Sequence, residues 1–94
     1  MKRRAYLEDD AIASIRSFGL SRQVLLDLLI HIADEMPARY ESFQRFRNED
    51  QRCAVCTISI LEGNEQHLFA LEVDDSTADD RLAVAQIVHR RRTV

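Results

Sequence analysis

The clearest hydrophobic pattern in the chain is a stripe of apolar residues between Ser21 and Pro37. Its members recur at the spacing of one helix face: Val24, Leu25, Leu28, Leu29, Ile32 and Met36. Ser21 is a typical N-cap residue, and Leu20 and Leu25 have the spacing of a hydrophobic staple. Proline disfavours the helical conformation of the residue before it. The pattern therefore predicts a helix of about four turns that begins after Ser21 and ends at Pro37.

A shorter helix is predicted just before this one. Within residues 11–18 an apolar residue recurs every three positions, at Ile12, Ile15 and Phe18. Asp9 or Asp10 is the expected N-cap of this helix. Gly19 stands where a helix C-terminus favours a left-handed residue, so we expect the chain to turn there.

After Pro37 the pattern changes from helical spacing to alternation. The predicted strands are Arg3–Leu7, Arg52–Leu61, Gln66–Val73 and Leu82–His89. In the second strand Cys56, Ile58 and Ile60 share one face, and Val55, Thr57 and Ser59 share the other. A hairpin turn is expected at residues 62–65 and an acidic loop at residues 74–80. The polar segment 39–50 fits a last helical turn, a loop or the approach to a strand.

These elements predict one α+β domain spanning residues 1–94. A short N-terminal strand is followed by two helices, which pack on one face of a small antiparallel sheet. The other face of the sheet is open to water or to a partner. Because Val55, Leu68 and Ala70 are apolar, we expect that open face to be incompletely solvated.

The net charge argues against a protein that coats nucleic acid by electrostatics alone. The chain has 13 Lys and Arg against 16 Asp and Glu, a net charge of −3, whereas such proteins usually carry a basic footprint. Arginines nevertheless cluster in the middle and at the end of the chain, at Arg45, Arg47, Arg52, Arg90, Arg91 and Arg92. No apolar run approaches the roughly 20 residues that span a bilayer, and the basic N-terminus lacks the apolar stretch of a secretory signal. We expect a cytoplasmic protein with no membrane contact.

The candidate metal and redox motifs are weak. Cys53 and Cys56 have the C-x-x-C spacing, but in a strand residues three apart point to opposite faces. We therefore interpret them as ordinary semi-buried residues. The acidic segment 74–80 lacks the alternation and the glycine of a calcium loop. The sequence predicts no metal site and no cofactor.

Histidine supplies the best candidate for chemistry. His89 precedes three arginines at the end of the last predicted strand, and RNA cleavage needs such a proton-transfer group beside phosphate-binding guanidinium groups. The other interpretation is a solvated basic tail after Val88. His31 is expected at the surface, and His67 has no evident partner.

The order of elements resembles the RelE/ParE superfamily of toxins from bacterial toxin–antitoxin modules. Two stretches carry the resemblance: the arginine-bearing Phe43–Arg52, leading into a central strand, and the closing Val88–Arg91 with its His-Arg pair. The resemblance implies either ribosome-dependent, metal-independent cleavage of messenger RNA or inhibition of DNA gyrase. It also implies neutralisation by an antitoxin protein.

The site residues follow from the same resemblance. Carried over by position, His89, Arg91 and Arg45 would be catalytic in a nuclease, and Arg47, Arg52, Arg90 and Arg92 would bind nucleic acid. Two functional hypotheses remain open. One is a RelE/ParE-like toxin or diverged relative that binds a macromolecular target through an arginine-rich sheet face. The other is a non-enzymatic protein-interaction module, with a homodimer as one form.

Overall fold

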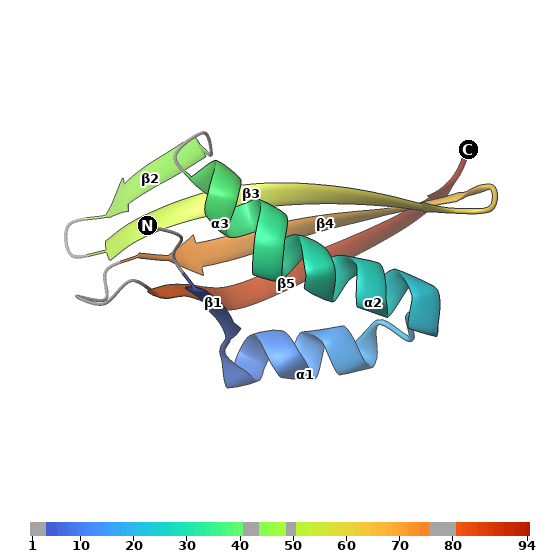
Figure 1. The fold of residues 1–94 in the computed structure, drawn as a ribbon, viewed down its shortest axis with the longest axis horizontal. Coiled ribbons are helices and arrows are strands. Elements are labelled where there is room, and N and C mark those ends of the chain that lie inside the picture. Colours follow the sequence, from blue (N-terminus) through green and yellow to red (C-terminus); the bar gives the residue numbers. More distant parts are fainter. Residues whose placement is uncertain (1–3, 41–43, 49–50, 76–80) are drawn as a thin grey trace.

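The protein has an α+β fold in which helices cover one face of a sheet (Figure 1). The computed structural model describes residues 4–40, 44–48, 51–75 and 81–94, with the backbone alone at 44–48 and 51–53. The described elements, in chain order, are β1 (Arg4–Leu7), α1 (Asp9–Ser17), α2 (Arg22–Ile30), the π-helical turn η1 (His31–Glu35), α3 (Met36–Arg39), β2 (Gln44–Asn48), β3 (Gln51–Glu62), β4 (Glu65–Asp74) and β5 (Arg81–Thr93). None of these described helices is long and apolar enough to cross a membrane.

The described strands form one mixed sheet in the order β1-β5-β4-β3-β2. Strands β2 to β5 pair antiparallel, but β1 pairs parallel with β5, with Arg4 beside Arg81 and Leu7 beside Val84. The predicted antiparallel sheet is confirmed for β3, β4 and β5, and the parallel pairing of the N-terminal strand makes the whole sheet mixed. The chain leaves β1 through the helices and returns to the sheet at its other edge with β2. The beginning of the last strand, β5, then pairs with β1.

The core lies between the helices and one face of the sheet. The α2–α3 stripe buries Val24, Leu28, Ile32 and Met36. Against it lie the inward rows Cys56, Ile58 and Ile60 of β3, Phe69, Leu71 and Val73 of β4, and Leu82, Val84 and Ile87 of β5. Leu29, predicted in the stripe, is instead 36% exposed. Leu26 and Ile30 are also exposed, so the outer side of α2 carries apolar residues of its own.

Strand β5 changes its inward row partway along. The pairing with β4 shifts between Glu72 and Val73, so that Glu72 faces Gln86 whereas Val73 faces Val84. Ala85 is the extra residue of this β-bulge, and a bulge reverses the side to which later residues point. As a result Ile87, His89 and Arg91 continue the row begun by Leu82 and Val84.

The long helix does not end at Pro37, contrary to the prediction. Residues 31–35 form a π-helical turn, in which the Met36 N–H donates to the carbonyl of His31, five residues back. Pro37 then lies at the start of α3, which continues to Arg39. Proline has no N–H to donate and clashes with the preceding helical turn, so it breaks a regular helix. The wider π turn comes directly before it, a common place for such irregularities.

The helix ends follow the predicted signals in part. Ser21 caps α2, and its Oγ accepts a hydrogen bond from the Val24 N–H at 3.2 Å. Gly19 adopts φ +63° directly after α1, as predicted. The predicted caps Asp9 and Asp10 instead lie inside the first turn of α1, where their charges favour the positive end of the helix dipole.

Leu28→Ala will lower the free energy of unfolding by about 2–5 kcal/mol, because Leu28 is fully buried between α2 and the sheet. Leu26→Ala, two residues away on the outer side of the same helix, is the matched control. Leu26 is 49% exposed, so its truncation will cost no more than about 0.5 kcal/mol. Urea denaturation of the two variants measures the difference, and equal losses would contradict the described orientation of α2.

Candidate functional site

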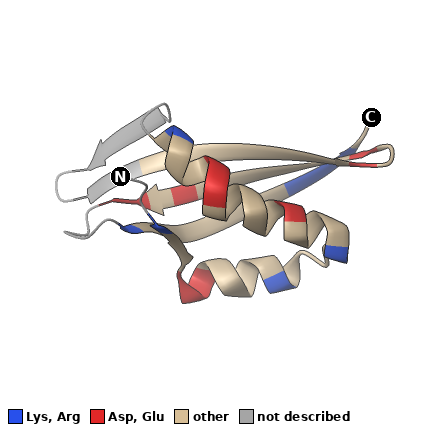
Figure 2. Ribbon diagram, in the orientation of Figure 1, with Lys and Arg blue, Asp and Glu red and all other residues tan. Residues whose placement is uncertain are grey.

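Polar and charged residues gather where the β3–β4 hairpin extends beyond the hydrophobic core. They are Glu62, Glu65, His67, His89 and Arg91, which we call the hairpin cluster. Alternation along β4 continues the inward row from Phe69 to His67 and then Glu65. The register places Glu62 opposite Glu65, and His67 opposite Arg91. Figure 2 shows the acidic hairpin beside the basic end of β5.

Two histidines form the interior of the hairpin cluster. His67 Nδ1 lies 2.9 Å from His89 Nε2, and the two rings are within 9° of parallel. Phe18, which ends α1, and Phe69 of β4 pack on the His89 ring with centroid distances of 5.0 and 4.9 Å. His67 is only 1% exposed. Aromatic packing therefore holds both imidazole rings in fixed positions.

The surroundings of His89 favour its neutral form. Partial burial is the main cause that lowers the pKa of His89 below its ordinary value of 6.5, and the nearby His67 and Arg91 lower it further. At neutral pH one N–H therefore lies between the two rings. His67 donates it to His89, or His89 donates it to His67, according to the tautomer.

The carboxylates lie on the other side of His67. Glu65 Oε2 is 3.7 Å from His67 Nε2 and 3.7 Å from Arg91 Nε. Glu62 Oε2 accepts a 2.5 Å hydrogen bond from the Ser21 hydroxyl, which ties the hairpin to the N-cap of α2. Within the described part of the chain, buried His67 Nε2 has no hydrogen-bond partner.

The structure brings some of the predicted site residues together and separates others. His89 and Arg91 both belong to the hairpin cluster. Arg90 and Arg92 point to the opposite, uncovered face, where Arg92 Nε donates to Gln66 Oε1. The last strand therefore distributes its arginines over both faces of the sheet.

The middle arginines lie at the far end of the sheet. Arg45, Arg47 and Arg52 belong to β2 and β3, at positions where the structure describes only the backbone. Arg45 pairs with Ala54 of β3, whereas Arg91 lies across the sheet from Ile60 of β3, through His67. Ala54 and Ile60 are six residues apart along β3, which is about 20 Å at roughly 3.3 Å per residue. A joint catalytic site of Arg45 with His89 and Arg91 would have to span that distance.

Sequence reasoning missed three members of the hairpin cluster. The sequence pattern indicates no partner for His67, and it predicts Glu62 and Glu65 only as turn residues. The Gly63-Asn64 turn contained the necessary signal, because a two-residue turn sets the register that places Glu62 opposite Glu65. The contact with His89 could not be found in this way, because it depends on the β-bulge in β5.

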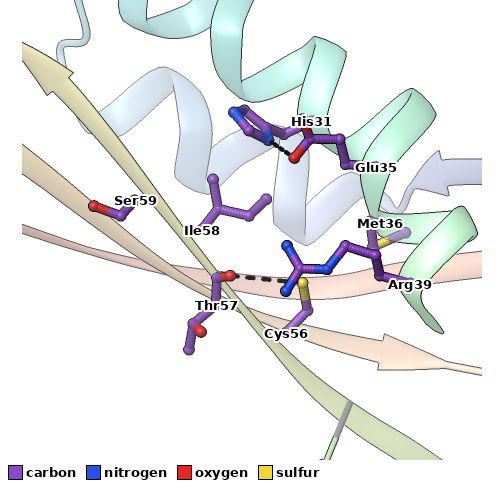
Figure 3. A pocket seen from close by; sticks show the side chains of 8 residues that line it. All are labelled: His31, Glu35, Met36, Arg39, Cys56, Thr57, Ile58 and Ser59. Carbon is purple, nitrogen blue, oxygen red and sulfur yellow. Dashed lines mark hydrogen bonds and ion pairs between the residues drawn. The ribbon is translucent and has the colours of Figure 1, made fainter. Parts of the chain in front are cut away.

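Apart from the hairpin cluster, a polar hollow lies between the π turn and β3 (Figure 3). It encloses about 130 Å³ and is lined by His31, Glu35, Met36, Arg39, Cys56, Thr57, Ile58 and Ser59. His31 Nδ1 and Glu35 Oε2 are 2.6 Å apart, one helical turn from each other. Burial raises the pKa of the Cys56 thiol to about 11, against a smaller opposing effect of Arg39. Cys56 is therefore a protonated, unreactive thiol at neutral pH, and the side chain of Cys53 lies outside the described residues.

The sheet face away from the helices is apolar at its centre. Leu68 and Ala70 of β4 and Val88 of β5 line a hollow of about 300 Å³ together with Thr57, Ser59 and Arg90. Val88 is 59% exposed, and Leu61 at the end of β3 is 65% exposed. The incomplete solvation expected for this face stays a prediction, because Val88 and Leu61 are exposed in the single chain.

We expect His89 to titrate below 6.5 when followed by NMR in a chelating buffer, which keeps metal ions off the histidines. Arg91→Gln will raise this pKa because it removes a nearby positive charge, whereas Arg4→Gln on β1 will leave it unchanged. The unfolded chain binds this proton more readily than the folded protein does. The free energy of unfolding will therefore fall as the pH drops below about 6.5 through the folded pKa. A His89 pKa above 6.5 would contradict the described packing.

Comparison of the chain with protein-family models, with curated protein sequences and with solved structures finds no match. We therefore infer the function of the chain from the geometry of the described residues.

Proposed function

We propose that the protein is a non-enzymatic protein-interaction module whose uncovered sheet face binds a second copy of the chain. The observation that carries this proposal is the apolar row of Leu68, Ala70 and Val88, of which Val88 is exposed and the other two are half-buried. This row lines a hollow that no described helix covers. Removing such a row from water is favourable by roughly 25 cal/mol for each Å² buried. Exposed apolar patches of this kind mark interaction surfaces.

The charges beside this row favour a second copy as the occupant. Ala70 pairs with Val88 at the centre, Arg90 lies two residues toward the hairpin, and Glu72 lies two residues the other way. Two sheets that stack face to face are about 10 Å apart. If their strands run in opposite directions, Arg90 of one copy comes within reach of Glu72 of its partner. A twofold axis generates this contact twice.

The chemistry of the other candidate sites gives less support to an enzyme. The predicted nuclease site requires Arg45 and Arg91 to act together, and the strand registers separate their backbones by about 20 Å. The Cys56 thiol, with its pKa raised to about 11, is a poor nucleophile. Binding through the uncovered face requires neither of these groups.

If two copies associate through the uncovered face, a single charge introduced into the apolar row abolishes the dimer. Val88→Arg will convert the dimer to a monomer in sedimentation experiments, because it places a charge at the centre of the apolar row. Leu26→Arg is the matched control, since Leu26 is a similarly exposed apolar residue on the outer side of α2. Loss of the dimer in Leu26→Arg but not in Val88→Arg would assign the interface to the helix face and refute the proposal.

The charge contacts provide a second test of the same interface. Arg90→Glu will weaken the dimer because it opposes Glu72 of the partner with a like charge. The double variant Arg90→Glu/Glu72→Arg will restore the dimer by exchanging the two signs. If the double variant is as weak as the single one, the copies do not stack with opposed strands.

A toxin of the RelE/ParE type is the second candidate. The described order of one strand, two helices and a closing strand ending in His89 to Arg91 supports it. Arg90 also lines the uncovered face, where a nucleic-acid or protein target would bind. On this proposal the target is the ribosome with its messenger RNA or DNA gyrase, and an antitoxin covers the apolar row.

Growth after controlled induction in bacteria tests the toxin proposal. The parent chain is expected to arrest growth. Arg90→Ala/Arg92→Ala is expected to relieve the arrest, because it removes both arginine side chains from the uncovered face. Arg16→Ala/Arg22→Ala removes two exposed helix arginines instead and should remain toxic. Normal growth on expression of folded parent protein would count against the toxin.

A further inference from the structure

We propose that Glu62, Glu65 and His67 bind a divalent transition-metal ion of the zinc type at the end of the β3–β4 hairpin. This site lies on the helix side of the sheet, so the inference does not depend on the proposed dimer. It departs from the sequence analysis, which predicted no metal site.

The three ligand atoms have nearly the required separations. One carboxylate oxygen from each glutamate and one nitrogen of His67 lie within 4.8 Å of one another. His67 Nε2 and Glu65 Oε2 are 3.7 Å apart. Two ligands about 2.1 Å from a tetrahedral zinc ion are roughly 3.4 Å apart. Small side-chain rotations would therefore complete the geometry, with a fourth position left for water.

The backbone holds these residues together before any ion binds. Glu62 and Glu65 pair across the hairpin, and Gly63 makes the two-residue turn possible with φ +61°. His67 lies two residues after Glu65, so alternation brings it to the same face. The Ser21 hydroxyl orients Glu62 through its hydrogen bond. The ligand spacing is thus set by the two-residue turn and one helix cap.

Buried His67 Nε2 is the observation that points to a ligand. His67 is 1% exposed, and this atom has no hydrogen-bond partner among the described residues. Leaving a buried polar atom unpaired costs about 1–3 kcal/mol. When His67 donates its Nδ1 proton to His89 Nε2, the lone pair on Nε2 points toward the carboxylates. A lone pair beside two carboxylates is a binding position for a cation, and His89 is then the outer partner that orients the ligand.

The local charge also favours a cation. Glu62 and Glu65 carry two negative charges, and Arg91 is the single positive side chain with a described contact to either, 3.7 Å from Glu65. Glu62 receives only a neutral hydroxyl from Ser21. A mixed nitrogen and carboxylate set suits zinc better than magnesium or calcium, which prefer oxygen ligands.

Zinc binding to the chelator-treated full chain, followed by isothermal titration calorimetry, tests the proposal. One zinc ion per chain is expected, with much weaker binding of magnesium. Glu62→Gln/Glu65→Gln will weaken zinc binding more than about 100-fold, because it removes two ligands and even outer partners contribute 10–100-fold. These glutamates are not buried, so the variant will fold; circular dichroism confirms this.

Two matched experiments test two other possible sites, the His31–Glu35 pair and the cysteines. Glu35→Gln disrupts the His31–Glu35 pair on the π turn and should leave zinc affinity unchanged. Cobalt substituted for zinc should show visible absorption without a thiolate charge-transfer band, because neither cysteine is a ligand. Unchanged affinity in Glu62→Gln/Glu65→Gln, lost affinity in Glu35→Gln, a thiolate band or no zinc binding at all would each overturn the proposal.

Discussion

The packing of the α2–α3 stripe on the inward rows of β3 and β4 is the interaction on which the rest of the structure depends. Val24, Leu28, Ile32 and Met36 provide a continuous apolar surface for one face of the sheet. The π turn preserves that surface past Pro37, where a regular helix would break. Because the described helices cover only this face, the opposite face keeps Leu68, Ala70 and Val88 in contact with solvent. The proposed association follows directly from this one-sided coverage.

The hairpin cluster results from the same geometry at the end of the helices. Strands β3, β4 and β5 extend beyond the apolar part of the helices, and their inward rows become polar there. Ser21 at the start of α2 and Phe18 at the end of α1 close over the cluster and hold Glu62 and His89 in place. The proposed self-association and the proposed metal site therefore lie on opposite faces of the same strands. The association uses the apolar face, and the metal site lies on the polar end of the other.

The local pattern of the sequence predicted most elements but not how they meet. The α2 stripe, the Ser21 cap and the alternation of β3 are properties of neighbouring residues, so they could be read directly. The parallel pairing of β1 with β5 joins distant segments and leaves no local signal. The β-bulge at Ala85 also escaped prediction, although it decides that His89 rather than Val88 faces the helices. The sequence indicates His89 and Arg91 as site residues. It does not indicate their partners His67 and Glu65, because the bulge decides which face His89 and Arg91 share.

The most direct test of the central claim is an isotope-filtered NMR experiment on a mixture of labelled and unlabelled chains. It detects contacts between protons of different copies. Stacking of the uncovered faces predicts intermolecular contacts of the Val88 methyl groups with those of Leu68 and Ala70. Intermolecular contacts confined to Leu26 and Ile30, or none in a concentrated sample, would contradict the account.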